Sequence, residues 1–155
     1  MTKRFAAPVA CATTALVLLG ACSDDSAPTI LARGEGVGFV GGAAGLSDQT
    51  MDITAEEDDG EVSGEVRFNP AQLTLDVQCA DSDADGMVIV GGQATADSED
   101  GTPKGGWVAV GIREGDPDGV GVWFPEDDIG SCQELLESFP DDEPLADATA
   151  DIETG

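Results

Sequence analysis

The feature that most constrains the fold is a strict alternation of apolar and polar residues along two neighbouring segments. In residues 62–68, valine, glycine and phenylalanine alternate with serine, glutamate and arginine; in residues 73–79, leucine, valine and cysteine alternate with threonine, aspartate and glutamine. A period of two gives a strand one apolar face and one polar face. Asn69 and Pro70 between the segments are residues typical of turns. The sequence therefore predicts a hairpin with one buried face, on which Cys79 lies.

Further segments show the same pattern, and Gly- and Asp-rich stretches separate them. They are residues 50–55, 87–96, 107–113 and 120–124, with a last candidate at 148–152. Many short strands at close spacing are typical of β-sandwiches and β-barrels. We expect an all-β fold, namely a single small antiparallel β-sandwich or barrel-like domain over residues 34–155.

One helical turn is expected near the C-terminus. Ser131 and Glu134 have the spacing of a capping box, in which each side chain accepts a hydrogen bond from the other residue's backbone amide. Leu135 and Leu136 follow, and Pro140 ends the segment. The pattern predicts a helix of about two turns.

The N-terminus has the form of an export signal. Lys3 and Arg4 precede an apolar stretch, residues 5–19, that is too short and too interrupted for a membrane span. Residues 19–22, which read LGAC, resemble the bacterial lipobox. The resemblance implies that Cys22 receives a diacylglyceryl group and that the chain is cut before it. The alternative is an ordinary signal peptide followed by an unmodified cysteine. On the lipobox interpretation, residues 1–21 are a signal peptide and residues 22–33 a tether.

The remaining cysteines favour one disulfide. Cys11 leaves with the predicted signal and Cys22 takes lipid, so Cys79 and Cys132 remain as an even pair in an exported chain. Thiols of exported proteins tend to oxidise. A bond between these two cysteines contributes about 4 kcal/mol in the chain-entropy model. The alternative is two buried free thiols.

Residues 34–124 resemble a small secreted β-domain family of the post-COAP type. The matching motifs are GEVRF at residues 64–68, VQC at 77–79, VIVGGQAT at 88–95 and REGDP at 113–117. The resemblance implies a compact β-domain of an exported protein that serves as an interaction or accessory module.

Charge and composition exclude several classes of function. The 155 residues include 32 Asp and Glu but only 6 Lys and Arg, which gives a formal net charge of −26, and there is no His. Such a polyanion has no means of releasing counterions from a phosphate backbone, which argues against nucleic-acid binding. Without histidine there is no imidazole base and no histidine-ligated metal. The acids serve either solubility or the recruitment of cations and basic partners.

One acidic loop has the spacing of a calcium site. Asp81, Asp83 and Asp85 alternate before Gly86, which matches the first half of a calcium-binding loop. The expected glutamate at the twelfth position is replaced by Gly92. The alternative is a polar hairpin turn made by Asp85 and Gly86.

Other candidate groups have a simpler interpretation. The acidic runs at residues 56–59 and 126–128 contain carboxylate pairs of the kind that glycosidases use, but runs of charge are usually solvated loops. Trp107 and Trp123 either form a ligand-stacking surface or cap the core.

The sequence therefore predicts a non-enzymatic, lipid-anchored binding or accessory module on the outer face of a membrane in the cell envelope. Its partners are the membrane, through the lipid, and a basic envelope protein, but not nucleic acid. It needs no cofactor. The alternative function is a calcium-binding lipoprotein that uses the Asp81 loop.

We predict that the native protein partitions into the detergent phase and that Cys22→Ala abolishes this partitioning, because two or more acyl chains are needed for stable anchoring. Phase separation followed by intact-mass measurement tests this. A Cys22→Ala variant that stays in the detergent phase would contradict lipidation at Cys22.

Overall fold

A computed structural model describes residues 27–41 and 48–155. The predicted signal peptide and the predicted lipid attachment site at Cys22 lie outside these residues. The first described strand, β1 (Thr29–Val40), begins earlier than Gly34. Residues 29–33, which the sequence placed in the tether, are therefore part of the sheet.

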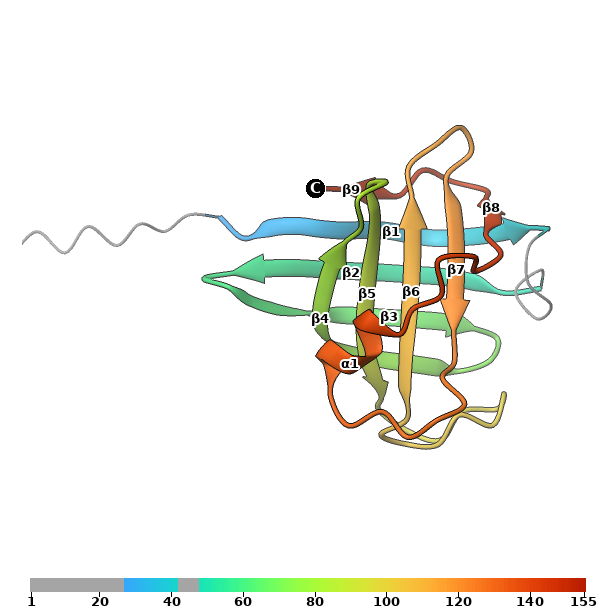
Figure 1. The fold of residues 1–155 in the computed structure, drawn as a ribbon. Helices are drawn as coiled ribbons and strands as arrows, with labels where there is room; N and C mark the ends of the chain where they lie inside the picture. Colours follow the sequence, from blue (N-terminus) through green and yellow to red (C-terminus); the bar gives the residue numbers. More distant parts are fainter. Residues whose placement is uncertain (1–26, 42–47) are drawn as a thin grey trace, which may run out of the picture.

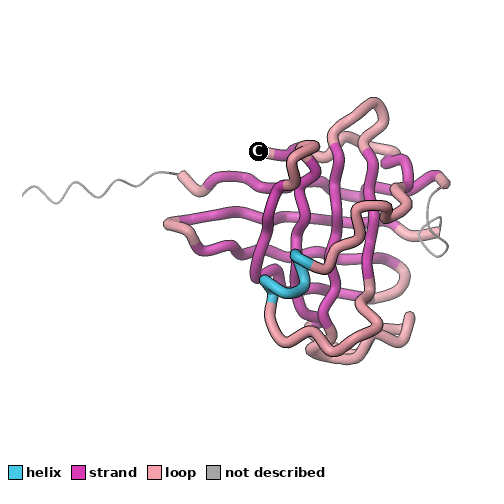
Figure 2. Tube along the Cα trace, viewed as in Figure 1, coloured by secondary structure: helices cyan, strands magenta, loops and turns pink. Residues whose placement is uncertain are grey.

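The described chain is mostly β-structure, with 53% of it in strands, one short helix and loops between them (Figures 1 and 2). After β1, the elements in order are β2 (Thr50–Asp58), β3 (Glu61–Asn69), β4 (Leu73–Ser82), β5 (Met87–Ala94), β6 (Trp107–Arg113), β7 (Gly119–Trp123), α1 (Cys132–Glu137), β8 (Ala146–Ala148) and β9 (Glu153–Thr154). No helix within residues 27–41 and 48–155 is long and apolar enough to cross a membrane.

The strands close into an antiparallel barrel, which confirms the predicted fold class. Strands β1 to β7 follow one another as a meander, and β8 joins β7 to β1, so that eight strands form the barrel and β9 is an extra strand on β1. Closure depends on β1, which pairs with β2 along most of its length and with β8 through Phe39 and Val40. A closed barrel leaves no long unpaired edge.

The buried Asp118 fastens the segment that closes the barrel. Its two carboxylate oxygens accept hydrogen bonds from the backbone amides of Gly115, at 2.9 Å, and Ile152, at 2.7 Å. One side chain therefore ties the β6–β7 turn to the chain between β8 and β9. The sequence predicts a single strand at residues 148–152; the structure instead has β8, which ends at Ala148, and β9, which begins at Glu153.

The apolar faces predicted from the alternation fill the barrel. Met51 and Ile53 on β2, Val66 and Phe68 on β3 and Leu75 on β4 are almost fully buried in one cluster. Val108, Val110 and Ile112 on β6 and Val120 and Val122 on β7 join the same cluster. Its members include large side chains in close contact, so most of the barrel interior is a packed core.

A β-bulge changes the face on which Cys79 lies. In the β4–β5 pairing, Val77 lies opposite Gly92 but Cys79 lies opposite Gly91, so Gln78 is an extra residue. Val77 packs inside the barrel, whereas Cys79 packs against the outer cluster. The prediction that Cys79 shares the inner face of β4 is therefore wrong, because a bulge shifts the alternation by one residue.

A second apolar cluster covers the outer face of β5 and β6. Helix α1 and the residues after it place Leu135, Leu136 and Phe139 over Met87, Ile89 and Ala109. The helix begins as predicted: the Ser131 hydroxyl accepts a hydrogen bond from the amide of Glu134 at 3.2 Å. The Glu134 carboxylate accepts from the amide of Gly130, rather than from that of Ser131 as in a full capping box.

The helix is connected to the barrel wall by cysteines. The Sγ atoms of Cys79 and Cys132 lie at disulfide-bonding distance, with Cα atoms 6.0 Å apart, as the pairing predicted from the sequence requires. Gly91 on β5 lies directly beneath them. A Cβ atom at this position would lie 2.8 Å from Cys79 Sγ and 2.8 Å from Leu135 Cδ2. The absence of a side chain at Gly91 lets α1 approach the sheet.

We predict that Gly91→Ala destabilises the protein by about 1–3 kcal/mol, because the added methyl group must displace the cystine or Leu135. Gly130→Ala is the matched control: its Cβ would meet only the far end of the flexible Glu134 side chain, at 3.2 Å. Denaturant unfolding of both variants tests this. Equal stability of the two variants would show that α1 is not closely seated on Gly91.

Candidate binding site

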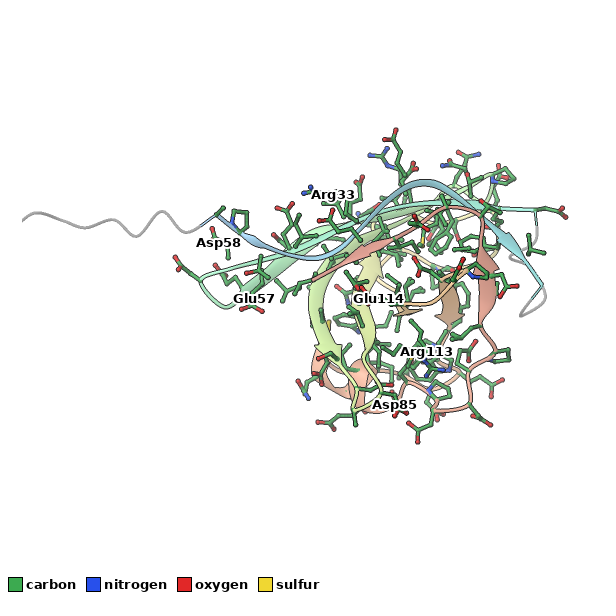
Figure 3. All side chains as sticks on the ribbon, turned by 90° about the horizontal axis from the view of Figure 1, so that it is seen from above. Arg33, Glu57, Asp58, Asp85, Arg113 and Glu114 are labelled. Carbon is green, nitrogen blue, oxygen red and sulfur yellow. A yellow bond between two sulfur atoms is a disulfide. The ribbon has the colours of Figure 1, made fainter. Side chains whose placement is uncertain are left out.

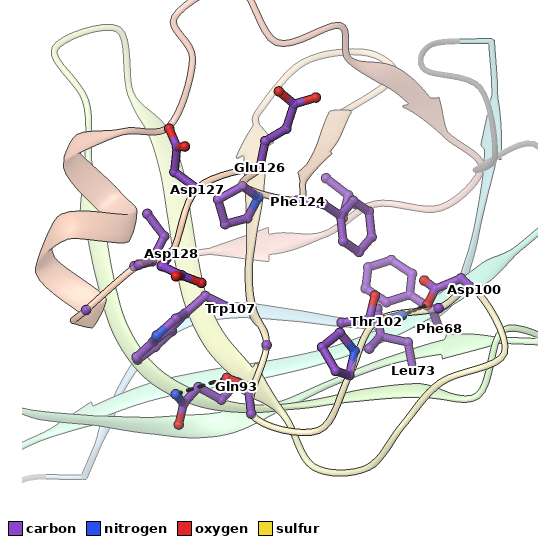
Figure 4. Close-up of a pocket in the computed structure, with 18 of the residues that line it drawn as sticks. Phe68, Leu73, Gln93, Asp100, Thr102, Trp107, Phe124, Glu126, Asp127 and Asp128 are labelled. Carbon is purple, nitrogen blue, oxygen red and sulfur yellow. Dashed lines mark hydrogen bonds between the residues drawn. The ribbon is translucent and has the colours of Figure 1, made fainter.

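Three connections meet at one end of the barrel, where two of them and the adjoining strand ends line a hollow of about 850 Å³ (Figure 4). Residues 95–106 join β5 to β6, residues 124–131 join β7 to α1, and the turn after Asn69 joins β3 to β4. In an antiparallel barrel, alternate connections lie at the same end, which brings these three together. The mouth of a barrel is a common position for ligand sites.

One side of the hollow is apolar. Phe68 and Leu73 are 2% and 1% exposed and form its floor, and Val122 lies beside them. Phe124 lies above them at the end of β7, facing Phe68 (Figure 4). Its side chain is 44% exposed. A phenyl ring in this position offers a surface that an apolar ligand group can cover.

The other side combines an aromatic ring with a carboxylate. Trp107, at the start of β6, lies on the same side as Asp128 from the facing loop (Figure 4). The indole packs partly against the outer cluster, which fixes it in place. Gln93 lies below and donates a hydrogen bond from Nε2 to the carbonyl oxygen of Gly105 at 3.2 Å. Glu126 and Asp127, from the same loop as Asp128, project outward in Figure 4.

The loop over residues 95–106 is held by its own side chains. The Asp100 carboxylate accepts hydrogen bonds from the Ser98 hydroxyl and, at 3.0 Å, from the amide of Thr102. The Asp97 carboxylate accepts from the amide of Lys104 at 2.8 Å. Such contacts order a connection that has no regular secondary structure.

Asp100 is ionised at neutral pH. Partial burial by itself would raise the pKa of this carboxyl, but the hydrogen bonds from Ser98 and Thr102 outweigh burial and lower the pKa. A carboxyl group that acts as a general acid needs the opposite shift. Asp100 therefore contributes a fixed negative charge and loop order to the hollow.

The predicted calcium loop lies at the other end of the barrel, between β4 and β5. Asp83 Oδ1 accepts hydrogen bonds from the amides of Asp85, at 2.9 Å, and Met87, at 2.8 Å. Asp81 Oδ1 accepts from the amide of Ser82 at 2.8 Å. These are the contacts of a hairpin turn. In the part of the chain that the structure describes, no group of three Asp, Glu or Cys side chains is placed to hold a metal. Calcium binding stays a prediction, which calorimetry with Ca²⁺ tests.

The two acidic runs do not meet. Glu57 and Asp58 lie at the protruding end of the β2–β3 hairpin (Figure 3), where Glu56 accepts a hydrogen bond from Arg33 at 2.6 Å. Residues 126–128 lie at the barrel mouth. The two runs thus belong to different parts of the surface, and neither faces the other across a substrate-sized gap.

The tryptophans divide between the two roles considered for them. Trp123 packs edge-on against Phe139, with ring centroids 6.3 Å apart, and so covers the outer core. Trp107 packs there too but also lines the hollow. The hollow itself is not predicted from the sequence, and neither is a role for Phe124 or Asp128 within it. The sequence features that could have indicated them are slight: Phe124 is an apolar residue at the end of a predicted strand, and Asp128 belongs to the acidic run that follows it.

No family model, curated protein or solved structure matches this chain. The resemblance to the post-COAP type therefore stays a prediction.

We predict that Asp100→Asn lowers stability at neutral pH by under about 1 kcal/mol, because the site is exposed and solvent weakens its contacts. The folded-state pKa of Asp100 lies below the unfolded value, so its contribution is present at neutral pH and lost as the pH falls through the folded-state pKa. The difference in stability between the native protein and Asp100→Asn should therefore shrink as the pH falls. Thermal unfolding between neutral and acidic pH tests this, with Asp127→Asn as the control. A deficit independent of pH would contradict it.

Proposed function

We propose that this chain is a lipid-anchored, non-enzymatic binding module of the cell envelope, and that its ligand or partner engages the hollow at the barrel mouth. The observation that carries the proposal is the hollow itself. It combines an exposed phenyl ring, an indole and carboxylates on connections that a rigid barrel holds in place. Ligand sites combine apolar and aromatic side chains with a few polar groups in this way.

The residues around the hollow support binding over catalysis. Its lining contains no cysteine, serine, lysine or histidine that could act as a nucleophile or base. Its carboxylate with a shifted pKa, Asp100, has that pKa lowered, which favours a permanent charge over proton transfer. The cystine lies on the outer wall of the barrel, under α1, and takes no part in the hollow.

The position of the hollow suits a module tethered at its N-terminus. Thr29 pairs with Glu57 near the end of β2, whereas Met51 at the start of β2 pairs with Phe68 on the floor of the hollow. The 9 residues of β2 span roughly 30 Å at about 3.4 Å per residue. A tether at residues 22–28 therefore joins the barrel far from its mouth, which leaves the mouth accessible above a membrane.

The acidic surface supports a basic partner. With a net charge of −26, the protein attracts cationic groups and repels nucleic acid and anionic headgroups. Contacts of this kind weaken as the salt concentration rises. The recruitment of a basic envelope component, which the sequence analysis considered, fits a hollow whose charged lining residues are all acidic.

A photo-crosslinking residue in place of Pro103, on the exposed rim, tests the proposal in the source cell. We expect a defined adduct, and Phe124→Ser should abolish it. When isolated envelopes are irradiated at high salt, the amount of this adduct should fall. The matched control carries the same residue in place of Glu57 and should give no such adduct. Adducts at Glu57 but not at Pro103, or adducts at Pro103 that Phe124→Ser leaves unchanged, would contradict binding at the mouth.

A further inference from the structure

We infer that the hollow takes an amphipathic organic cation, that is, an ammonium or guanidinium group attached to an apolar segment. The inference rests on the proposed function and specifies the ligand class for the same site. It follows from the separation of the lining into an apolar half and an anionic aromatic half, described above (Figure 4).

The apolar half requires an apolar ligand segment. Phe68, Leu73 and Val122 line this half but are almost fully buried, so the apolar surface that a ligand can cover is mainly that of Phe124, which is 44% exposed. Covering the Phe124 ring removes apolar surface from water, and each ligand methylene that is buried against it favours binding by roughly fourfold. A bare inorganic ion leaves this half uncovered.

The second half selects a positive charge. Asp128 and Trp107 line the same side of the hollow, so a cation there contacts a carboxylate and can lie against an indole face. Asp100 adds a permanent negative charge across the hollow, and Glu126 and Asp127 extend the negative field at its rim. The charged lining residues are all acidic, with no Lys or Arg among them. The exposed Lys104 lies between the lining residues Pro103 and Gly105.

The same geometry argues against a metal ion and an anion. The described residues provide no cluster of three ligating side chains, and the lining acids lie on two different loops. A hydrated metal ion also gains little from aromatic rings. An anion in the hollow would lie near Asp100 and Asp128, with Glu126 and Asp127 adding to the repulsion from the rim.

Calorimetric titration of the purified full chain with hexyltrimethylammonium tests the inference. Hexanesulfonate and hexanol serve as probes with the same chain but a negative or no charge, and tetramethylammonium as a probe with the charge but no chain. We expect hexyltrimethylammonium to bind with one-to-one stoichiometry and at least about tenfold more tightly than any of the three, because both halves are needed.

Variants locate the site. Asp128→Asn and Trp107→Leu should each weaken binding of hexyltrimethylammonium by roughly two- to fivefold, and Phe124→Ser by about tenfold or more. Asp85→Asn, at the opposite end of the barrel, removes the same charge as Asp128→Asn and should leave affinity unchanged. Equal binding of tetramethylammonium, or equal losses in Asp85→Asn and Asp128→Asn, would show mere attraction to a polyanion and overturn the inference. If a partner crosslinks at Pro103 but hexyltrimethylammonium binds no more tightly than the other three probes, the proposed binding site stands and this ligand class is rejected.

Discussion

The seat of α1 on the outer wall of the barrel is the constraint on which the candidate site depends. Gly91 supplies the space, and Cys79 and Cys132 supply the link between the helix and β4. Because β7 ends at the barrel mouth and α1 lies on the outer wall, residues 124–131, which connect them, run along the mouth. They carry Phe124 and Asp128 into the lining of the hollow. A structural contact between α1 and the barrel wall therefore shapes the surface that we propose for binding.

Much of the barrel was predictable from local pattern. The alternation in residues 62–68 and 107–113 correctly assigned which side chains face the core, because the buried face of a strand repeats every second residue. The face of Cys79 was not predictable in this way. The bulge at Gln78 arises from pairing with β5, and nothing in the alternation of β4 signals it. The short strands β8 and β9 depend on long-range pairing with β1 and on the hydrogen bond that Asp118 accepts between them, and local propensity encodes neither.

The candidate site was much less predictable than the fold. Its lining comes from the ends of strands β3 to β7 and from two separate connections, which only the closed barrel brings together. Phe124 resembles an ordinary core residue in the sequence, since it continues the alternation of Val120 and Val122. It remains exposed because the strand ends at Trp123 and the chain turns away toward α1. Conversely, the most motif-like segment, the Asp81 loop, uses its Asp83 carboxylate to build a hairpin turn.

Hydrogen–deuterium exchange, compared between the native protein and a Cys79→Ala/Cys132→Ala variant, tests the central claim most directly. If the cystine holds α1 on the barrel wall and so positions the loop at the mouth, removing it should speed exchange in residues 124–139. Strands β2 and β3, which lie away from α1, should keep their protection. Unchanged exchange in residues 124–139, or equal acceleration throughout the barrel, would show that the cystine does not shape the mouth in the way we infer.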